Sequence, residues 1–176
     1  MNDPRFCDLS GKVVTPQDPD YEEALREGDQ AIQKFPKTIV YCYDKYDVAN
    51  AVLWSKCHHA PFRIRNGGHD HEGDSTGNEV VVIDISSMNN ISLHNHLLTV
   101  AGGVTSNQLV DFISSKGYHS PDATRCYSLI EVELVNYDGE IILANQDNNQ
   151  TILADCQESG GSHFGVIVNM VFRLSL

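Results

Sequence analysis

The sequence predicts an α+β fold, of the mixed α/β kind, in which two small lobes carry mixed sheets. The length of 176 residues suits one domain or two small lobes with a shared core. Apolar residues make up 41% of the chain, as in an ordinary globular protein. Strand-like and helix-like segments follow one another without an internal repeat. We therefore expect a single domain over residues 1–176, with lobe one at about 1–86 and lobe two at about 87–176.

Seven segments have the composition of strands, which favours β-branched and aromatic residues. Val80–Ile85 is apolar almost throughout, which is typical of a strand covered on both faces. Residues 128–135 alternate apolar with acidic side chains and predict a half-exposed strand, and Asp138–Gly139 favours a hairpin after it. In order, the strands are expected over residues 38–43, 62–65, 80–85, 97–101, 128–135, 140–144 and 163–174.

Helices are predicted between these strands. Asp44 with Asp47 three residues later resembles a capping box, and Thr105 with Gln108 forms a second one. Gly117 ends the helix that Thr105 begins. Residues 145–161 are polar and loop-like, with room for a short helix. The three predicted helices cover about residues 21–34, 45–58 and 105–117.

The net charge excludes some classes of binding partner, and the cysteines indicate the cellular compartment. The formal net charge is −12, which argues against nucleic acid or an anionic membrane as the main partner. Any bound phosphate must then be held mostly by backbone N–H groups. No apolar run is long enough to span a membrane, and the first residues lack the features of a signal peptide. Five scattered cysteines without a CxxC pair indicate reduced thiols, so we expect a cytoplasmic protein.

The most informative motif is the segment from Arg63 to Gly73, between two predicted strands. Gly67 and Gly68 allow positive φ and let a ligand lie against the bare backbone. His69 follows directly, where the turn must project its imidazole. A glycine turn with a projected histidine suits the binding of a large cofactor, and the alternative is an ordinary turn with an exposed histidine.

Histidines and carboxylates also raise the possibility of a metal site. Residues 69–72 read His-Asp-His-Glu, and His94 and His96 would lie on one face of a strand. The spacing typical of zinc sites is missing, and nothing in the sequence brings the two groups together. We therefore predict no native metal site, and no Ser-His-Asp set can be assembled from spacing.

In their order along the chain, several motifs resemble the FAD-binding domain of berberine bridge enzyme-like oxidases, within the vanillyl-alcohol-oxidase or PCMH-type flavoproteins. The resemblance extends from about Thr15 to Leu174. It rests on residues 39–52, PFRIRNGGH at 61–69, VIDIS at 82–86, GGV at 102–104, LIEVELVNYDG at 129–139 and GGSHFGV at 160–166.

The resemblance implies a PCMH-type fold, bound FAD and an oxidase-type FAD-dependent oxidoreductase. In that family the histidine corresponding to His69 often carries an 8α-histidyl bond to the flavin, so FAD covalently attached through His69 is expected. A neutral imidazole, with a reference pKa of ~6.5, suits this role as a nucleophile. The implied cofactor-binding residues are Arg65, Asn66, Gly67, Gly68, Asp70 and Gly73 in the pyrophosphate turn, with His71 in the place of an aromatic residue; Gly102 and Gly103 in a second turn; Val132 near the adenine; and Phe164 and Gly165 near the flavin.

The chain also departs from the family's pattern. The family has a long glycine-rich segment, with a second flavin-linking cysteine, where this chain has only a short stretch between Gly117 and Ser128. An aromatic pair is replaced by residues 151–155, and the family's substrate domain, which supplies the catalytic base, would follow Leu176. No catalytic residue can therefore be named.

Two hypotheses follow from these departures. The first is an FAD-binding module of a flavin-dependent oxidoreductase whose catalysis is reduced or absent. The second is a flavin-free scaffold or partner-binding protein, in which a self-dimer or a partner covers apolar area at the shortened segment. Neither the substrate nor the oligomeric state follows from the sequence.

Overall fold

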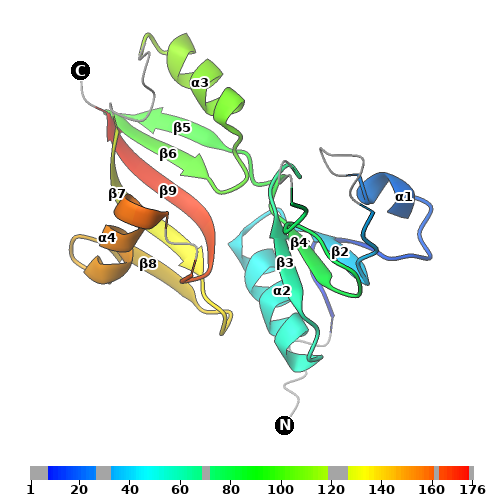
Figure 1. Ribbon diagram of the computed structural model, residues 1–176. Helices are drawn as coiled ribbons and strands as arrows, with labels where there is room; N and C mark the ends of the chain where they lie inside the picture. Colours follow the sequence, from blue (N-terminus) through cyan, green and yellow to red (C-terminus); the bar gives the residue numbers. More distant parts are fainter. Residues whose placement is uncertain (1–7, 27–32, 69–71, 119–126, 161–162, 175–176) are drawn as a thin grey trace. The chain divides into compact units, whose positions relative to one another are not determined.

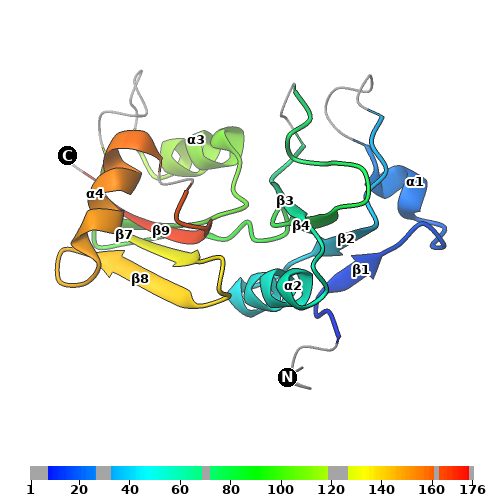
Figure 2. The same ribbon diagram turned by 60° about the horizontal axis from the view of Figure 1, so that its bottom comes forward.

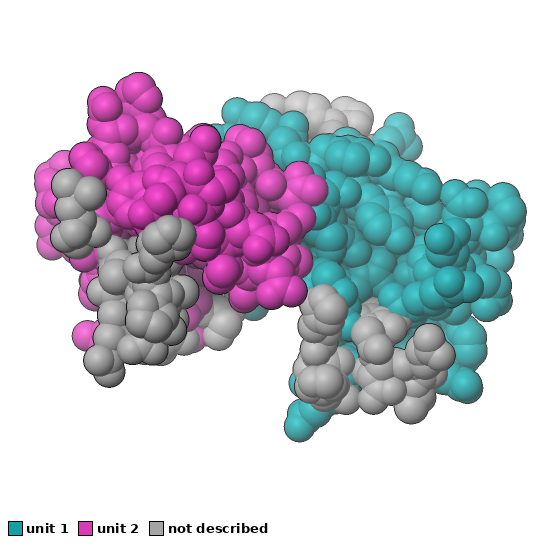
Figure 3. Space-filling model, turned by 90° about the horizontal axis from the view of Figure 1, so that it is seen from above, with its two compact units in different colours: residues 1–87, 137–140 teal, residues 88–136, 141–176 magenta. Residues whose placement is uncertain are grey.

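The computed structural model describes residues 8–26, 33–68, 72–118, 127–160 and 163–174. The chain divides into two compact units, shown in Figure 3 in teal and magenta. The first unit contains residues 1–87 with 137–140, and the second contains residues 88–136 with 141–176. The α+β class with a sheet in each unit is confirmed.

The first unit is built on a mixed four-stranded sheet (Figure 1). Strands β2, β4 and β3 are parallel, and β1 runs antiparallel to β2 at one edge. The predicted double coverage of the segment at 80–85 is confirmed, because β4 is buried along its whole length. In sheet order the strands are β1 (Lys12–Val14), β2 (Thr38–Tyr41), β4 (Val81–Asp84) and β3 (Phe62–Arg65).

Two helices accompany this sheet, α1 (Tyr21–Ala24) and α2 (Lys45–Cys57). Tyr21 and Ala24 pack in one cluster with Ile39 of β2 and Val82 of β4. Helix α2 contacts β4 and buries its own apolar residues, among them Val48. The hydrophobic residues of α1 and those of α2 therefore both cover the sheet. This explains why β4 contains almost no polar residue.

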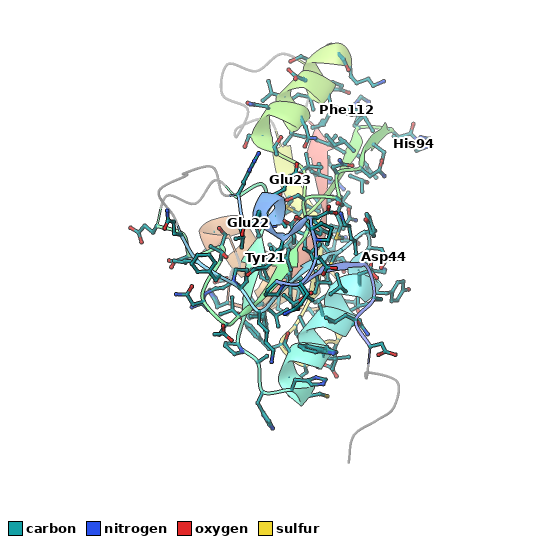
Figure 4. The ribbon with its side chains drawn as sticks, turned by 90° about the vertical axis from the view of Figure 1, so that its right-hand side faces the viewer. Tyr21, Glu22, Glu23, Asp44, His94 and Phe112 are labelled. Carbon is teal, nitrogen blue, oxygen red and sulfur yellow. The ribbon has the colours of Figure 1, made fainter. Side chains whose placement is uncertain are left out.

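The start of α2 is the one that the sequence predicts. Asp44, labelled in Figure 4, caps the helix by accepting hydrogen bonds from the backbone N–H groups of Tyr46 and Asp47. The carboxylate of Asp47 accepts in turn from the N–H of Tyr43 at 3.0 Å. The reciprocal bond thus reaches one residue further back than in a standard capping box.

The second unit is a five-stranded sheet in which every neighbouring pair is antiparallel. The predicted mixed sheet is therefore found in the first unit only. Helices α3 (Ser106–Ser115) and α4 (Gln150–Ser159) lie on the same face of this sheet (Figure 2). In sheet order the strands are β5 (Ile91–His94), β6 (Leu97–Ala101), β9 (Val166–Leu174), β7 (Tyr127–Val135) and β8 (Ile141–Asn145).

Two hydrophobic clusters stabilise the second unit. One packs beneath α4 around Val132 and Leu134, and the other packs beneath α3 around Leu98 and Ile113. Among the described residues, Met170 of β9 is the one that packs against both clusters. Phe112, labelled on α3 in Figure 4, packs against the second cluster.

Some elements differ from the predictions. The short strands β1 and β5 were not expected. The short helix for which the polar segment at 145–161 has room is present as α4, with ten residues. The capping box at Thr105 and Gln108 is confirmed, and Gly117 follows α3 with a φ of +83°. Strand β1 has only one buried residue, so its three residues carry too little hydrophobic pattern to be seen in the sequence.

Candidate functional site

The glycine turn follows directly on β3. Gly67, Gly68 and Gly73 have φ values of +71°, +64° and +72°, in the left-handed region that favours glycine. The residues between Gly68 and Gly73 include His69, Asp70 and His71, and these three lie outside the described residues. The predicted turn is thus present, whereas the expected role of His69 stays a prediction.

The turn lies at the carboxyl end of a parallel strand. Strands β2, β4 and β3 run in the same direction, so their carboxyl ends lie at one edge of the first sheet. In open α/β sheets, ligands bind outside this edge. Gly67 and Gly68 follow β3, and Ser86 comes two residues after the end of β4. The sequence motif and the preferred ligand-binding edge therefore coincide.

A chain of hydrogen bonds fixes the start of the turn to the core. The backbone N–H of Gly67 donates to Ser86 Oγ at 2.8 Å, and the N–H of Ser86 donates to Asp84 Oδ1 at 2.8 Å. The other carboxylate oxygen of Asp84 accepts from Arg65 Nε at 2.5 Å. Gly67 is thus held by the side chain of Ser86, and the backbone N–H of Ser86 is held by the buried ion pair.

Arg65 has a different place from the one expected for a pyrophosphate ligand. Its side chain is buried, and besides Asp84 it donates to the carbonyl oxygen of Ala24 at 2.9 Å. The guanidinium is therefore committed to the interior of the first unit. Asp84 is in turn a buried carboxylate that is hydrogen-bonded to Arg65.

Sequence reasoning missed Ser86. Its hydroxyl group is what accepts the N–H of Gly67, and a serine between two apolar segments gives no sign of such a contact. The strand register does give a sign of this contact, because it pairs Arg65 with Asp84 across β3 and β4. Two residues after that pair, the chain must pass beside the turn.

Gly102 and Gly103 lie in the second unit and have bonds within it. Their N–H groups donate to the carbonyl oxygens of Val168 at 2.9 Å and Met88 at 3.0 Å. A Cβ atom on Gly102 would lie 2.2 Å from the carbonyl oxygen of Ile167. Gly102 is therefore required for the close approach of β6 and β9, whatever further role it has.

The other three predicted residues are also in the second unit. Val132 is fully buried in the cluster beneath α4, and Phe164 is half-buried against the same cluster. Gly165 has a φ of +152°, and a Cβ atom there would lie 2.1 Å from the carbonyl oxygen of Val135. A glycine at 165 thus lets the chain pass close to β7 before β9 begins.

The expectation that His94 and His96 lie on one face of a strand is wrong. Strand β5 ends at His94, and Asn95 and His96 both have positive φ in the turn to β6. The ring of His96 lies with Nδ1 3.0 Å from the hydroxyl oxygen of Tyr118. The two imidazoles therefore do not share a strand face, and no metal-binding cluster of three such residues occurs among the described residues.

Comparison with known proteins supports the resemblance. The sequence profile of a family described as the FAD binding domain matches residues 36–130, more than half of the chain. The chain belongs to this FAD binding domain family. Among the helices that the structure describes, none has the length and apolar character of a membrane span.

Relatives and similar structures agree with this membership. The uncharacterized FAD-linked oxidoreductase YgaK of Bacillus subtilis (strain 168) is 28% identical over 195 residues, covering 94% of this chain and 43% of the relative. The crystal structure of 6-hydroxy-D-nicotine oxidase from Arthrobacter nicotinovorans has a TM-score of 0.84 at 20% identity, covering 95% of this chain and 43% of that one. Physcomitrella patens BBE-like 1 has a TM-score of 0.82 at 20% identity, with 95% and 42% covered. The PCMH-type fold is therefore confirmed, and the chain spans less than half the length of these proteins.

The alignments also contain an internal difference in length. The match to YgaK spans 195 positions, whereas 94% of this chain is about 165 residues, so about 30 positions of YgaK have no counterpart here. Tetrahydroberberine oxidase of Berberis wilsoniae gives the same surplus, because its match spans 169 positions over 79% of this chain, about 139 residues. This chain is thus internally shorter than its relatives.

Proposed function

We propose that this chain binds FAD as the cofactor module of an oxidase-type FAD-dependent oxidoreductase, and that the turn beginning at Asn66 holds the pyrophosphate. The observation that carries the proposal is the glycine turn at the carboxyl edge of the parallel strands, fixed by Ser86. Membership of the FAD binding domain family supports it. When bound, FAD supplies two-electron oxidation chemistry, which the side chains of the protein lack.

In the proposal, the turn holds the anionic group through its backbone and not through a basic side chain. The protein carries a net charge of −12, and Arg65 is already engaged inside the unit. Glycines in the left-handed region allow a phosphate to approach the backbone without a Cβ in the way. In the proposal, the side chain of Ser86 holds Gly67 in place, and Asp84 orients Ser86.

The proposal includes the covalent bond that the resemblance implies, between His69 and the flavin. The experiment is to purify the protein, add FAD, remove the free cofactor and record the absorbance that stays with the polypeptide before and after denaturation. Yellow colour that survives denaturation, and is lost on denaturation of His69→Ala, supports the tether. Colour that is released by denaturation from the unaltered protein overturns the tether but supports binding.

A matched pair of glycine variants tests the turn itself. Gly67→Ala and Gly117→Ala both place a Cβ atom at a positive φ, and Gly117 has open space around it. We expect Gly67→Ala to weaken FAD binding at least tenfold and Gly117→Ala to leave it unchanged. Ser86→Ala should weaken binding in the same direction, because Gly67 then loses its hydrogen-bond acceptor. Equal affinities in all three variants would place the cofactor elsewhere.

The second candidate function is a flavin-free scaffold or partner-binding protein. Three observations favour it: the shortened interior of the chain, the engagement of Arg65, and the internal bonds of Gly102 and Gly103. Each charge-assisted hydrogen bond lost with the missing positions would cost roughly 1.5–3 kcal/mol of binding free energy. A colourless protein that takes up no added FAD would overturn the first function and favour this second one, and full uptake would exclude the second. If FAD binds, reduced oxidase activity is expected because about 30 internal positions of the relatives have no counterpart here.

A further inference from the structure

The first unit contains a pocket that the proposed function does not use. It lies at the amino end of β3, whereas the glycine turn follows the carboxyl end of this strand. Its volume is about 620 Å³, within the range of about 300–1,000 Å³ that is typical of ligand-binding pockets. There is therefore room for a small organic molecule outside the glycine turn. The lining includes Lys56 of α2, the residues Phe62, Arg63 and Ile64 of β3, and Tyr137 with Asp138.

The turn at residues 137–140 forms one wall of the pocket. These residues connect β7 to β8 but belong to the first unit. Asp138 makes an ion pair with Lys56 of α2. Gly139 lies so close to the same helix that a Cβ atom on it would be 2.4 Å from Cγ of Leu53. The wall is thus held on α2 by a charged contact and by close packing.

Two rings give the pocket an aromatic surface. The ring centroids of Phe62 and Tyr137 are 6.0 Å apart, and the ring planes are tilted by 36°. Tyr137 is 56% exposed, so part of its ring is open to solvent. Aromatic rings pair favourably at centroid distances of about 4.5–7 Å, in offset or edge-to-face geometry. A further flat ring can therefore extend this pair.

The outer edge of β3 contributes backbone donors. The N–H group of Val81 donates to the carbonyl oxygen of Pro61 at 2.9 Å, so Pro61 faces β4. Successive residues of a strand direct their N–H and C=O groups to opposite sides, and those of Phe62 and Ile64 therefore point away from β4. Strand β3 is the last in its sheet, and no strand among the described residues pairs with this side. Two N–H groups thus face the pocket edge.

Arg63 supplies the positive charge of the pocket. Its side chain leaves the strand on the face opposite to Phe62, but its guanidinium reaches the outer edge, where Nη1 lies 3.4 Å from the carbonyl oxygen of Phe62. The side chain is exposed, and no ion pair joins it to a carboxylate of the described residues. Lys56, by contrast, is paired with Asp138. Two basic side chains and one carboxylate leave the lining with an excess of one positive charge.

We propose that this pocket binds a small aromatic monocarboxylate. The carboxylate accepts hydrogen bonds from the planar guanidinium of Arg63 and from an N–H group of the β3 edge. The aromatic ring packs against Phe62 and Tyr137. One excess positive charge matches one carboxylate, and the net charge of −12 disfavours ligands with several negative charges. The site lies within the first unit alone and does not depend on FAD binding.

The probe is 2-naphthoate, whose fused rings carry a single carboxylate. Isothermal titration calorimetry with the full chain measures its affinity, and 2-naphthamide, with the same rings and no charge, is the matched control. We expect the amide to bind about tenfold more weakly, because it cannot accept a charge-assisted hydrogen bond from Arg63 through an ionised oxygen. The affinity for naphthoate should fall as salt is added, since Arg63 is exposed to solvent.

Two arginine variants of equal charge change locate the carboxylate. Arg63→Gln removes the guanidinium from the pocket, and Arg173→Gln removes an exposed one from β9 in the second unit. We expect Arg63→Gln to weaken naphthoate binding about tenfold. Arg173→Gln should leave the affinity unchanged.

Two tyrosine variants of the first unit locate the ring. Tyr137→Ser removes an aromatic side chain from the pocket, and Tyr43→Ser removes one of similar exposure, 59%, outside it. We expect Tyr137→Ser to weaken naphthoate binding about fivefold, because the ligand loses an aromatic neighbour. Tyr43→Ser should leave the affinity unchanged. Urea unfolding checks that both variants are folded, as the exposure of the two side chains leads us to expect.

A lack of saturable naphthoate binding would overturn the proposal, as would equal affinities for the acid and the amide. Equal effects of the two arginine variants, or of the two tyrosine variants, would place the probe outside this pocket and overturn it as well. Excess FAD should leave the naphthoate affinity unchanged, and displacement of naphthoate by FAD would assign the probe to the cofactor site instead. If the chain takes up no FAD, the naphthoate titration still decides whether this pocket binds a carboxylate.

Discussion

Arg65 and Asp84 lie directly opposite each other on the parallel strands β3 and β4, and their side chains form an ion pair of 2.5 Å in the interior of the first unit. Both residues are at least 95% buried. The pair occupies the last position of both strands, and Gly67 and Ser86 each come two residues later in the chain. The ion pair therefore contributes both to the packing of the sheet and to the conformation of the candidate site.

Asp84→Asn should destabilise the first unit strongly. The substitution keeps the shape but leaves the guanidinium of Arg65 buried without its anion, a change that typically costs about 3–5 kcal/mol. Urea unfolding monitored by circular dichroism measures the loss. Asp138→Asn is the control, because its ion pair with Lys56 is exposed and the change should lie within experimental error. A small effect of Asp84→Asn would mean that water reaches the pair.

Gly102→Ala should reduce stability even without FAD. The added Cβ atom would lie 2.2 Å from the carbonyl oxygen of Ile167, which is backbone and cannot rotate away. Overpacking of this kind costs about 1–3 kcal/mol. Gly117→Ala, where the space is open, should cost only the backbone strain of about 1 kcal/mol. Urea unfolding of both proteins without cofactor makes the comparison, and equal losses would show that β6 can shift away from β9.

Cys42 should resist thiol reagents in the folded protein, whereas the exposed Cys57 should react. Burial raises the pKa of the Cys42 thiol, and the nearby carboxylates of Asp47 and Asp84 raise it further. A thiol whose pKa is higher in the folded state stabilises folding below the unfolded value, near 9.0, and loses this contribution as the pH rises above it. Mass spectrometry after alkylation at pH 8 and pH 10 distinguishes the two cysteines. Labelling of Cys42 as fast as Cys57 would contradict this prediction.

Asp44→Ala should shorten or weaken α2. The carboxylate accepts hydrogen bonds from two N–H groups of the first turn, and loss of an N-cap typically costs about 1 kcal/mol. Asp44→Asn keeps an oxygen acceptor at the same place and should retain most of the stability. Thermal unfolding of the two variants measures the difference, and equal melting temperatures would mean that the cap contributes little.

Local signals made much of the fold predictable. Asp44 and Thr105 each start a helix as expected, because capping depends on residues three or four positions apart. The turn at Asn95 and His96 was not predicted, because both residues adopt positive φ and no glycine marks the turn in the sequence. The antiparallel arrangement of the second sheet could not be predicted either, because the direction of a strand depends on neighbouring strands that lie far apart in the sequence.

The candidate site was predictable in type but less so in detail. Gly67 and Gly68 stand out because positive φ nearly requires glycine. Arg65 was expected to face a ligand, and only the register reveals its bond with Asp84. Ser86 could not have been chosen, because its contact with Gly67 joins residues 19 positions apart.

Strand β9 lies between β6 and β7 in the second sheet, although it follows both of them in the chain. The β5–β6 and β7–β8 hairpins can therefore form on a ribosome before the strand that unites them has been synthesised. Until residues 166–174 emerge, each hairpin has an open edge where foreign strands can pair. Assembly of this unit should thus wait until β9 has been synthesised, and a nascent chain halted ahead of β9 should need protection by chaperones.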